Sequence, residues 1–451
     1  MVSSAKRNKN KTAWVVAVNM GYGHQRAAQP FTAIAEGGII SVNDYPGIPG
    51  NDKRKWESSR VFYELISRSK QLPLIGEALF GWYDRKFQSI ANFYPKRDLS
   101  DPGFQLKSMY RMIRAGWGKD LIDTLNKRNS RLPLLSTFFI PAFFADEHGY
   151  KGDIYCLATD TDIARQWAPF DGSKSRIKYL APTTRAFERL KMYGVQERNL
   201  FFTGFPLPKD NIGGSTMAAL KQDVWHRIHH LDPRHKFIDK YRESLVHYLG
   251  QDRNHCSDHC CLNITFAVGG AGAQRELGMT IVGSLARQLA GNRLVINLVA
   301  GARSDVYSYF NNQLKKLRLQ SHLGKNIRII FAKDKLEYFN SFNAALRTTD
   351  VLWTKPSELA FFSGLGIPII MAEPIGAQEI FNQQWLRAVG SGIDQQDPRY
   401  AHQWLPDWIE SGWLAEAALQ GFLDAPKFGT YNIEQIIFKQ KVRREGQVQL
   451  L

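Results

Sequence analysis

The sequence predicts an α/β protein with two Rossmann-like domains that face a cleft. Two apolar segments of strand type, residues 14–18 and 262–268, are each followed by a glycine-containing turn and a helical pattern. Two more strand–loop–helix units follow one another across residues 350–393. Strands that alternate with helices form parallel sheets. The length of 451 residues is enough for two domains with full hydrophobic cores.

The composition is that of an ordinary globular protein with a strong positive charge. Hydrophobic residues make up 44% of the chain and charged residues 22%, and the formal net charge is +17. Such a charge predicts an anionic partner: a phospholipid, a nucleic acid or a phosphorylated substrate. We recognise no nucleic-acid-binding module in the sequence, so we expect no specific nucleic-acid partner.

Three features predict a cytoplasmic protein. No apolar run reaches the roughly 20 residues that a transmembrane helix needs. The basic N-terminus lacks the apolar core of a secretion signal, because a strand-like run begins at residue 13. The four cysteines, three of them close together, argue against a disulfide framework.

The first strand, residues 14–18, leads into a turn that contains Gly21 and Gly23 and then His24. Glycines at these positions allow a tight turn and a close approach of the backbone to a ligand. A helix is expected to start around His24. The residues alone favour two roles equally. His24 either takes part in catalysis, or it caps the helix or hydrogen-bonds a phosphate.

Residues 53–119 combine many lysines and arginines with interleaved aromatic residues. We expect amphipathic helical patches at residues 61–66, 80–83 and 109–114. This composition suits a segment that lies on an anionic bilayer or grips a lipid-linked acceptor. It equally suits a surface layer of helices whose aromatic residues face the core.

Two acids follow the predicted strand at residues 153–158. Asp160 and Asp162 come directly after it, and Arg165 and Trp167 lie shortly beyond. Either carboxylate is a candidate for a general base or for a group that orients one. Alternatively, the two acids cap the next helix. The Asp-x-Asp spacing also occurs in metal-binding motifs, an interpretation that we discount here.

Residues 209–260 form a polar, helix-rich passage that we interpret as a linker with an insertion. Its end holds five soft metal ligands within residues 255–261. Zinc sites at finger spacing use a second Cys/His pair, which is missing here. We therefore predict no metal site.

The second domain begins with the strand at residues 262–268. Gly269, Gly270 and Gly272 follow it, with Gln274 at the start of a helical pattern. Glycines at a strand-to-helix junction expose backbone N–H groups that suit a diphosphate. A redox dinucleotide domain has a similar loop, but it places that loop after its first strand with an acid about 20 residues later.

The segment 354–393 holds the densest set of polar residues at strand ends. Lys355, Ser357 and Glu358 leave a buried strand, with Ser357 as the expected N-cap of a helix. After the apolar run 367–371, a second loop leads to a helix that carries three polar residues: Gln378, Glu379 and Asn382. In open α/β sheets, ligands bind at such carboxyl ends of strands.

The ordered set of these loops resembles the GT-B glycosyltransferases. The match consists of Thr-Lys-Pro, Gly-Ile-Pro and Pro-x-x-x-Gln-Glu-x-x-Asn in residues 354–382, together with the Gly-x-Gly-His turn, the Thr-Asp loop ending in Trp167, and the glycine-rich loop at 269–274. Within that fold, it is similar to the monogalactosyldiacylglycerol synthases and the lipid-linked peptidoglycan N-acetylglucosaminyltransferase. One departure is that the usual Lys-x-Gly-Gly loop is Lys355-Pro356-Ser357-Glu358 here, so Ser357 and Glu358 stand where the family carries glycines.

The resemblance implies roles for particular residues. His24 would act as the base for the acceptor hydroxyl, since the glycine-rich loop of the family lies close to the reacting centre. Gln378 and Glu379 would face the donor sugar, and Glu358 would reach a ribose hydroxyl. The glycine-rich loop would hold the donor diphosphate. No metal and no cofactor besides the nucleotide sugar are implied.

We therefore expect a glycosyltransferase that moves a sugar from a nucleotide sugar, UDP-linked, to a hydroxyl acceptor, with inversion; a lipid-linked acceptor is one candidate. The expected domains are residues 1–208 for the acceptor, 209–260 as linker or insertion, 261–408 for the donor, and 409–451 as a C-terminal helix and basic tail. The protein would be cytoplasmic and could bind the inner membrane surface peripherally.

Two alternatives remain open at this stage. One is a catalytically silent GT-B relative that binds a nucleotide or an anionic membrane lipid, which the altered loop 355–358 favours. The other is a nucleotide-sugar epimerase or hydrolase on the same fold.

Overall fold

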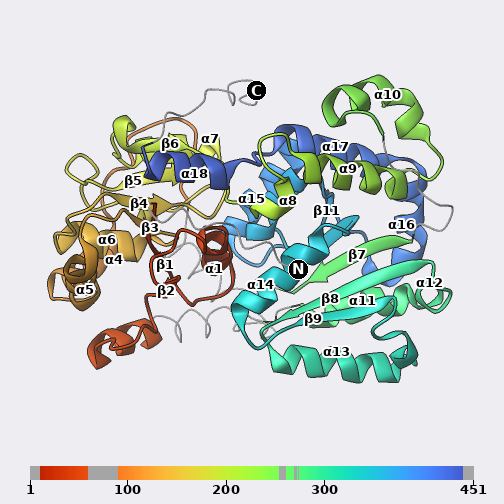
Figure 1. The fold of residues 1–451 in the computed structure, drawn as a ribbon, viewed down its shortest axis with the longest axis horizontal. Coiled ribbons are helices and arrows are strands. Elements are labelled where there is room, and N and C mark those ends of the chain that lie inside the picture. Colours follow the sequence, from red (N-terminus) through yellow and green to blue (C-terminus); the bar gives the residue numbers. More distant parts are fainter. Residues whose placement is uncertain (1–10, 59–89, 253–260, 269–271, 273, 440–451) are drawn as a thin grey trace. The chain divides into compact units, whose positions relative to one another are not determined.

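A computed structural model describes residues 11–58, 90–252, 261–268, 272 and 274–439. The chain forms two compact units, each built around its own sheet (Figure 1). The first unit contains the described residues of Met1–Pro206, Gly376–Gln378 and Phe428–Arg444. The second contains Glu379–Lys427 and the described residues of Leu207–Ile375.

The first unit is built on a six-stranded parallel sheet with the order β2-β1-β3-β4-β5-β6. The order doubles back at β1, so that β1 lies between β2 and β3. Such a reversal is a topological switch point, outside which the carboxyl ends of the strands leave a place for ligands. The strands are β1 (Trp14–Ala17), β2 (Ile40–Ser41), β3 (Leu134–Ser136), β4 (Ile154–Leu157), β5 (Lys178–Ala181) and β6 (Leu200–Phe202).

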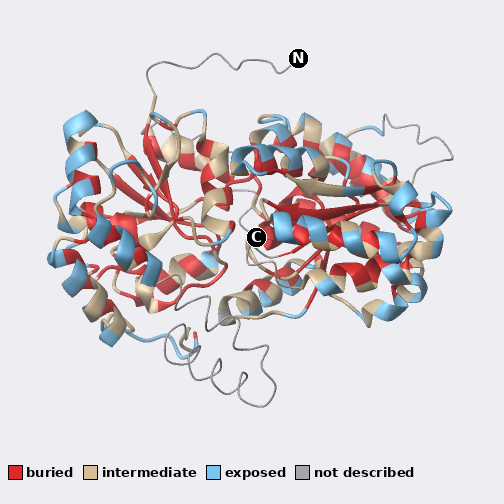
Figure 2. Ribbon diagram, turned by 90° about the horizontal axis from the view of Figure 1, so that it is seen from below, coloured by how far each residue is buried: buried red, intermediate tan, exposed pale blue. Residues whose placement is uncertain are grey.

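Helices flank this sheet, and the central strands are buried (Figure 2). All four residues of β1 are buried, as expected for a strand covered on both faces. Helix α7 begins after Thr183, whose hydroxyl accepts a hydrogen bond from the Ala186 amide and caps the helix. The helical elements within the described residues are a helix whose described part covers residues 50–58, α1 (Gly23–Ala28), η1 (Gln29–Phe31), α4 (Phe104–Arg114), α5 (Lys119–Asn129), α6 (Phe139–Glu147), η3 (Arg165–Trp167), α7 (Thr184–Met192), η4 (Glu197–Asn199) and α18 (Gly429–Ile437).

The second unit also has a six-stranded parallel sheet, with the order β12-β11-β10-β7-β8-β9. Counted from its own first strand, this is the 3-2-1-4-5-6 order of the dinucleotide-binding fold, and its switch point lies between β7 and β10. The strands are β7 (Leu262–Ala267), β8 (Leu294–Gly301), β9 (Ile327–Phe331), β10 (Val351–Thr354), β11 (Ile369–Met371) and β12 (Gly392–Asp394).

The helices of the second unit include two that pack directly on each other, α9 and α17. The complete set is α8 (Lys209–Ile212), α9 (Ala218–Leu231), α10 (Lys236–Leu249), α11 (Arg275–Ser284), α12 (Ala286–Ala290), α13 (Ser304–Lys316), η5 (Gln320–His322), α14 (Lys335–Leu346), η6 (Glu358–Leu365), α15 (Ala377–Val389), η7 (Pro398–Tyr400), α16 (Ala401–Glu410) and α17 (Trp413–Asp424).

The predicted fold class is confirmed: two parallel α/β units of Rossmann type follow one another along the chain. Part of the passage expected as a linker forms α8, α9 and α10, which belong to the second unit. Arg227 of α9 is buried and donates to the carbonyl oxygens of Thr349, Leu365 and Gly366 at 2.7–3.1 Å. These bonds tie α9 to the unit.

Two local expectations need comment. The helix predicted after Ser357 is the 3-10 helix η6, and the Ser357 side chain makes no cap bond in it. The amphipathic patches expected at residues 61–66 and 80–83, and most of the cysteine-histidine cluster, lie outside the described residues. No helix within the described part of the chain is both long and apolar enough to cross a membrane.

Candidate functional site

The loops at the switch point of the second sheet start close together, because β7, β10 and β11 end at the same height in the sheet. Thr354, the last residue of β10, is in register with Ala267 of β7 on one side and Met371 of β11 on the other. The loops that follow these three strands therefore start from one edge of the sheet. They carry most of the residues predicted to bind the donor.

The loop after β7 requires glycine at position 272. Gly272 has φ +72°, and a Cβ there would lie 3.1 Å from the Val306 side chain and 3.3 Å from the Arg303 guanidinium. Both the backbone angle and the close packing favour a residue without a side chain. Gln274 donates its side-chain amide to the Glu373 carbonyl oxygen at 3.1 Å, which links this loop to the loop after β11. Gly269 and Gly270 lie outside the described residues.

An ion pair joins the loop after β10 to the helix after β11. The Lys355 ammonium contacts the Glu379 carboxylate, and both side chains are largely buried, with 16% and 14% exposed. The second oxygen of Glu379 accepts a hydrogen bond from the Ile375 amide at 2.7 Å. The carboxylate is thus held at the start of α15 by a cation and a backbone N–H group.

The remaining residues that were predicted to bind the donor nucleotide sugar differ in how far they are buried. Ser357 and Glu358 lie at the start of η6, and Gln378 lies in the first turn of α15; all three are partly exposed. Asn382 is completely buried. Asn382 therefore lies within the packing of α15 in this structure, whereas the other three side chains are accessible at the edge of the sheet.

Arg303 is a site residue that sequence reasoning missed. It follows β8, and its guanidinium donates to Asp305 through Nε and Nη2, at 3.0 Å each. It also packs against Gly272, so a cation stands directly beside the glycine-rich loop. The signal was available in the sequence, because Gly301-Ala-Arg-Ser-Asp follows a buried strand as the other loops do.

The switch point of the first sheet holds His24. Its Nδ1 atom lies 2.8 Å from the Thr137 carbonyl oxygen and 3.4 Å from the Thr159 hydroxyl. Thr137 follows β3, Thr159 follows β4, and His24 is the second residue of α1, the helix after β1. Because a carbonyl oxygen only accepts, Nδ1 carries the proton of the neutral ring and Nε2 carries the lone pair.

Apolar and backbone contacts fix this imidazole. The ring lies 4.6 Å from the Phe138 ring and 6.1 Å from the Trp167 ring, centre to centre. The Thr137 hydroxyl donates to the His24 carbonyl oxygen at 2.8 Å. Gly21, with φ +83°, makes the turn that precedes α1, and Gly23 is the first residue of that helix.

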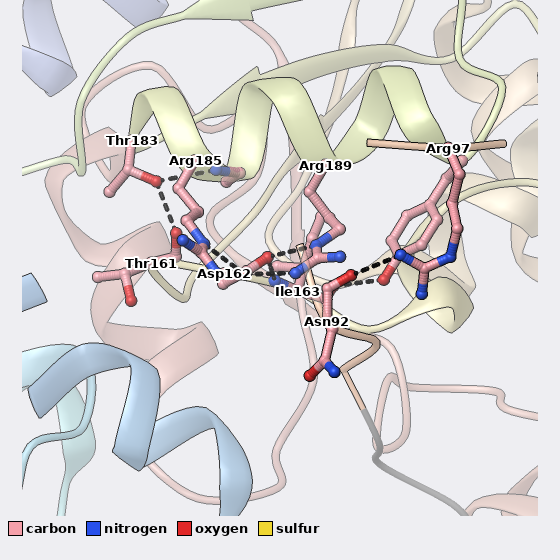
Figure 3. A network of polar contacts seen from close by, with 10 residues as sticks. Asn92, Arg97, Thr161, Asp162, Ile163, Thr183, Arg185 and Arg189 are labelled. Atoms are coloured by element: carbon pink, nitrogen blue, oxygen red, sulfur yellow. Dashed lines mark hydrogen bonds and ion pairs between the residues drawn. The ribbon is translucent and has the colours of Figure 1, made fainter. Parts of the chain in front are cut away.

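The two candidate acids have different environments. Asp162 is 1% exposed and lies under α7, where Arg185 and Arg189 point at it (Figure 3). Its oxygens accept three hydrogen bonds from these arginines at 2.8 Å and one from the Ile163 amide at 2.9 Å. A carboxylate saturated in this way is a poor proton acceptor, so this geometry favours a structural role for Asp162. Asp160 is only partly buried.

A polar cavity of about 220 Å³ lies beside the loops after β1 and β2. The Asn19 amide donates to the Asn43 side chain at 2.9 Å and so joins the two loops. Lys53 lies 3.6 Å from Asp44 at the same cavity. Its lining is predominantly polar and comprises Asn19, Asn43, Asp44, Lys53, Trp56 and Glu57.

Metal ligation was not predicted for any of these loops. In the part of the chain that the structure describes, no group of three or more His, Cys, Asp or Glu side chains is placed to hold a metal ion. Asp160 and Asp162 do not form such a group. Cys261, the one described member of the cysteine-histidine cluster, contacts the Asn292 carbonyl oxygen at 3.1 Å.

Comparisons with known proteins give a family of undefined role and several structures. Residues 318–433 match a family described as a domain of unknown function (DUF6938). This span contains β10 and β11 with Lys355 and Glu379. A search of curated proteins finds no match.

Three solved structures illustrate the similarity. HepE from Anabaena, in complex with UDP and glucose, has 10% identity and a TM-score of 0.46, covering 95% of this chain and 98% of that one. UDP-GlcNAc 2-epimerase from Neisseria meningitidis, bound to UDP-GlcNAc, has 12% identity and a TM-score of 0.41, covering 75% and 82%. MurG from Acinetobacter baumannii has 14% identity and a TM-score of 0.38, covering 74% and 78%. At such identities the likeness assigns no activity to this chain.

Proposed function

We propose that the protein is a glycosyltransferase that moves a sugar from a nucleotide sugar, UDP-linked, to a hydroxyl acceptor. The observation that carries the proposal is the loop cluster at the switch point of the second sheet. There Gly272, the cation of Lys355 and the carboxylate of Glu379 belong to loops and a helix that start from one edge. Ligands of doubly wound sheets bind at this place.

The donor is held by the second unit in this proposal. Backbone N–H groups around Gly272 and the charges of Lys355 and Arg303 act on the diphosphate, whose negative charge increases as it leaves. Glu379 and Gln378 accept and donate hydrogen bonds to the sugar hydroxyls, as the family resemblance implies. Lys355 must then exchange its contact with Glu379 for a contact with phosphate.

The acceptor is bound and activated by the first unit in this proposal. Its hydroxyl proton passes to Nε2 of His24 while its oxygen forms a bond to the anomeric carbon. The bond from that carbon to the diphosphate oxygen breaks, and the nucleoside diphosphate leaves with the electron pair. A single displacement of this kind inverts the anomeric carbon. The polar cavity beside Asn19 and Asn43 offers hydrogen-bonding groups for the part of the acceptor that carries the hydroxyl.

Three further parts of the proposal come from the family resemblance. The reaction needs neither a metal nor a cofactor beyond the nucleotide sugar. The acceptor is linked to a lipid. The protein works in the cytoplasm and binds the membrane surface peripherally, where its net charge of +17 attracts anionic lipids.

The experiment that tests the proposal measures nucleotide release by the full-length protein. UDP-glucose, UDP-galactose and UDP-GlcNAc are first ranked by the rise in melting temperature that each produces, since a ligand of the native state raises it. The best donor is then incubated with diacylglycerol-containing or polyprenyl phosphate-containing vesicles.

Four outcomes are distinguishable. UDP release that requires the acceptor, with a glycosylated product, supports the proposal. Release without acceptor would indicate a hydrolase, and an altered sugar that stays attached to UDP would indicate an epimerase. Binding without turnover against a broad acceptor panel would indicate a catalytically silent relative, and each of these three results would overturn the transferase assignment.

A further inference from the structure

A second cavity, of about 520 Å³, lies at the opposite end of the first sheet from His24. Tyr155 is the second residue of β4, Lys178 is the first residue of β5, and Leu200 is the first residue of β6. The cavity therefore opens near the amino ends of these strands, whereas the candidate catalytic loops follow their carboxyl ends. Its other lining residues are Phe201, Phe202, Gln435, Ile436 and Lys439.

The floor of this cavity is aromatic. Tyr155 is in register with Lys178, and Leu180 is in register with Phe201. Partners in register point to the same side of a sheet, and so do residues two apart on one strand. Tyr155, Lys178 and Phe201 therefore share one face.

Helix α18 lines the cavity beside this face. The Tyr155 hydroxyl donates to the Ile436 carbonyl oxygen at 3.4 Å. Burial raises the pKa of Tyr155 to about 12, so the phenol stays neutral. Because its hydroxyl bonds the helix, the tyrosine presents its ring to the cavity. With the half-buried Phe201 on the same face, it forms an apolar surface in a cavity of the size that small-molecule sites have.

The rim of the cavity is cationic. Lys178 and Lys439 lie 2.9 Å and 3.0 Å from the two oxygens of Asp153, so two ammonium groups share one carboxylate. The carboxylate neutralises one of the two ammonium charges, so the group of three side chains carries a net charge of about +1. The Lys178 ammonium also lies 5.3 Å above the Tyr155 ring, which places it between the apolar floor and the rim. An anionic group at this position has a complementary charge next to an apolar surface.

The lining also limits the kind of anion. Among its described residues there is no arginine and no glycine-rich turn, and Gln435 supplies the one side-chain amide. A diphosphate needs several convergent N–H groups, and a nucleobase needs hydrogen-bonding partners along its edge. The cavity offers neither set. Its polar groups suit a single head group, and its rings suit a hydrocarbon body.

We propose that this cavity binds a single-chain amphiphile with one anionic head group, a carboxylate or a phosphate monoester. The hydrocarbon chain lies along Tyr155 and Phe201, and the head group lies between Lys178 and Lys439. This binding does not depend on the glycosyl transfer proposed above, because none of these residues belongs to the loops at the carboxyl ends of the strands.

The test is a calorimetric titration of the full-length protein below the critical micelle concentration of each probe. The probes are dodecanoate, dodecyl phosphate and the uncharged monododecanoyl glycerol. We expect one site per chain, with at least one of the anions bound at least tenfold more tightly than the uncharged probe. The ratio of the two anions tells whether the head group is a carboxylate or a phosphate.

Matched lysine variants identify the site. Lys178→Gln and Lys439→Gln are each expected to weaken binding of the anion about tenfold. Lys174→Gln removes a lysine that is 85% exposed and pairs with Asp171, and it should leave the affinity within twofold. Tyr155→Phe keeps the ring and should also bind normally. Because the Lys439 side chain is 74% exposed, its substitution should not affect folding, which the melting temperature will verify.

Two results would overturn the proposal. One is equal affinity for the anionic and the uncharged probes, which would indicate non-specific association with apolar surface. The other is an equal effect of Lys174→Gln and Lys439→Gln, which would indicate general attraction to a basic protein. Absence of any binding by the three probes at millimolar concentration would also reject the site.

Discussion

His24 donates its Nδ1 proton to the backbone carbonyl oxygen of Thr137, across 2.8 Å, at the switch point of the first sheet. This bond fixes the tautomer of the neutral ring and orients the ring. Because the acceptor is a backbone carbonyl oxygen, it is present whatever side chain stands at position 137. The imidazole is held further by the Phe138 ring at 4.6 Å. If His24 is the base proposed above, an imidazole oriented in this way loses little entropy when an acceptor hydroxyl approaches it.

Replacement of His24 by glutamine should lower the turnover number by about 10²- to 10⁴-fold, the usual contribution of a positioned general base. The affinity for UDP should change less than twofold, because the proposal places nucleotide binding in the second unit. The control is His148→Gln, which removes a histidine with a similar bond, at 2.9 Å, to the Trp117 carbonyl oxygen. Equal turnover of the two variants would exclude His24 as the base.

Lys355 and Glu379 should respond differently to neutral substitutions. Lys355→Gln removes a charged partner of the diphosphate, worth about 1.5–3 kcal/mol, so UDP should bind at least tenfold more weakly. Glu379→Gln frees Lys355 from its ion pair, so UDP should bind as well as before or better, while sugar turnover falls. Titration calorimetry with UDP measures the first effect and nucleotide release the second.

The control for both substitutions is Lys316→Gln at the exposed end of α13, which should bind UDP normally. If Glu379→Gln weakens UDP binding as much as Lys355→Gln does, the ion pair itself maintains the loop. In that case neither residue could be assigned to a ligand.

Substitutions of Asp162 and Asp160 should differ in their effect on the free energy of unfolding. Asp162→Asn leaves the buried Arg189 without its charged partner, and loss of one member of a buried pair costs about 3–5 kcal/mol in the free energy of unfolding. Asp160→Asn should change that free energy by less than about 1 kcal/mol, because Asp160 is only partly buried. Urea denaturation measures both. An Asp162→Asn protein that is as stable as the wild type but inactive would restore Asp162 as a catalytic candidate.

The fold could be predicted because its signals are local. Apolar runs such as residues 14–18 are buried on both faces, and glycine turns such as that at Gly21 follow them, so the alternation of strands and helices is visible along the chain. The loops of the candidate site were found for the same reason, since polar residues at strand ends stand out. The order of the strands in space, which creates the switch points, needs the structure.

What the sequence could not supply depends on contacts between distant segments. Asp160 and Asp162 look alike in the sequence, and only the positions of Arg185 and Arg189, one turn apart on α7, distinguish them. The contact of Lys355 with Glu379 likewise depends on the register of β10 and β11. For Arg303 the sequence shows a polar loop after a buried strand, but its proximity to Gly272 is visible only in the structure.

Lys427 gives a prediction for the dependence of stability on pH. Its side chain is 2% exposed at the end of the second unit, and its ammonium lies 5.0 Å from the Phe422 ring. Burial lowers the pKa of Lys427 from 10.5 to about 8, against a smaller opposite effect of Asp424. Below pH 8 both the folded and the unfolded chain carry the charge. The folded state then bears a penalty of about 3 kcal/mol for the buried ammonium.

The direction of this pH dependence follows from the number of protons that Lys427 binds in the folded and the unfolded chain. Between pH 8 and 10.5 the unfolded chain binds more protons at this lysine than the folded chain, so its contribution to the free energy of unfolding rises with pH. Lys427→Met should therefore be more stable than the wild type at pH 7, by up to about 3 kcal/mol, and this advantage should disappear towards pH 10.5. Urea denaturation of both proteins at pH 7, 8.5 and 10 measures the difference, in which all other titrating groups cancel. A difference that stays constant with pH would mean that Lys427 keeps its proton in the folded state, and that the gain comes from packing alone.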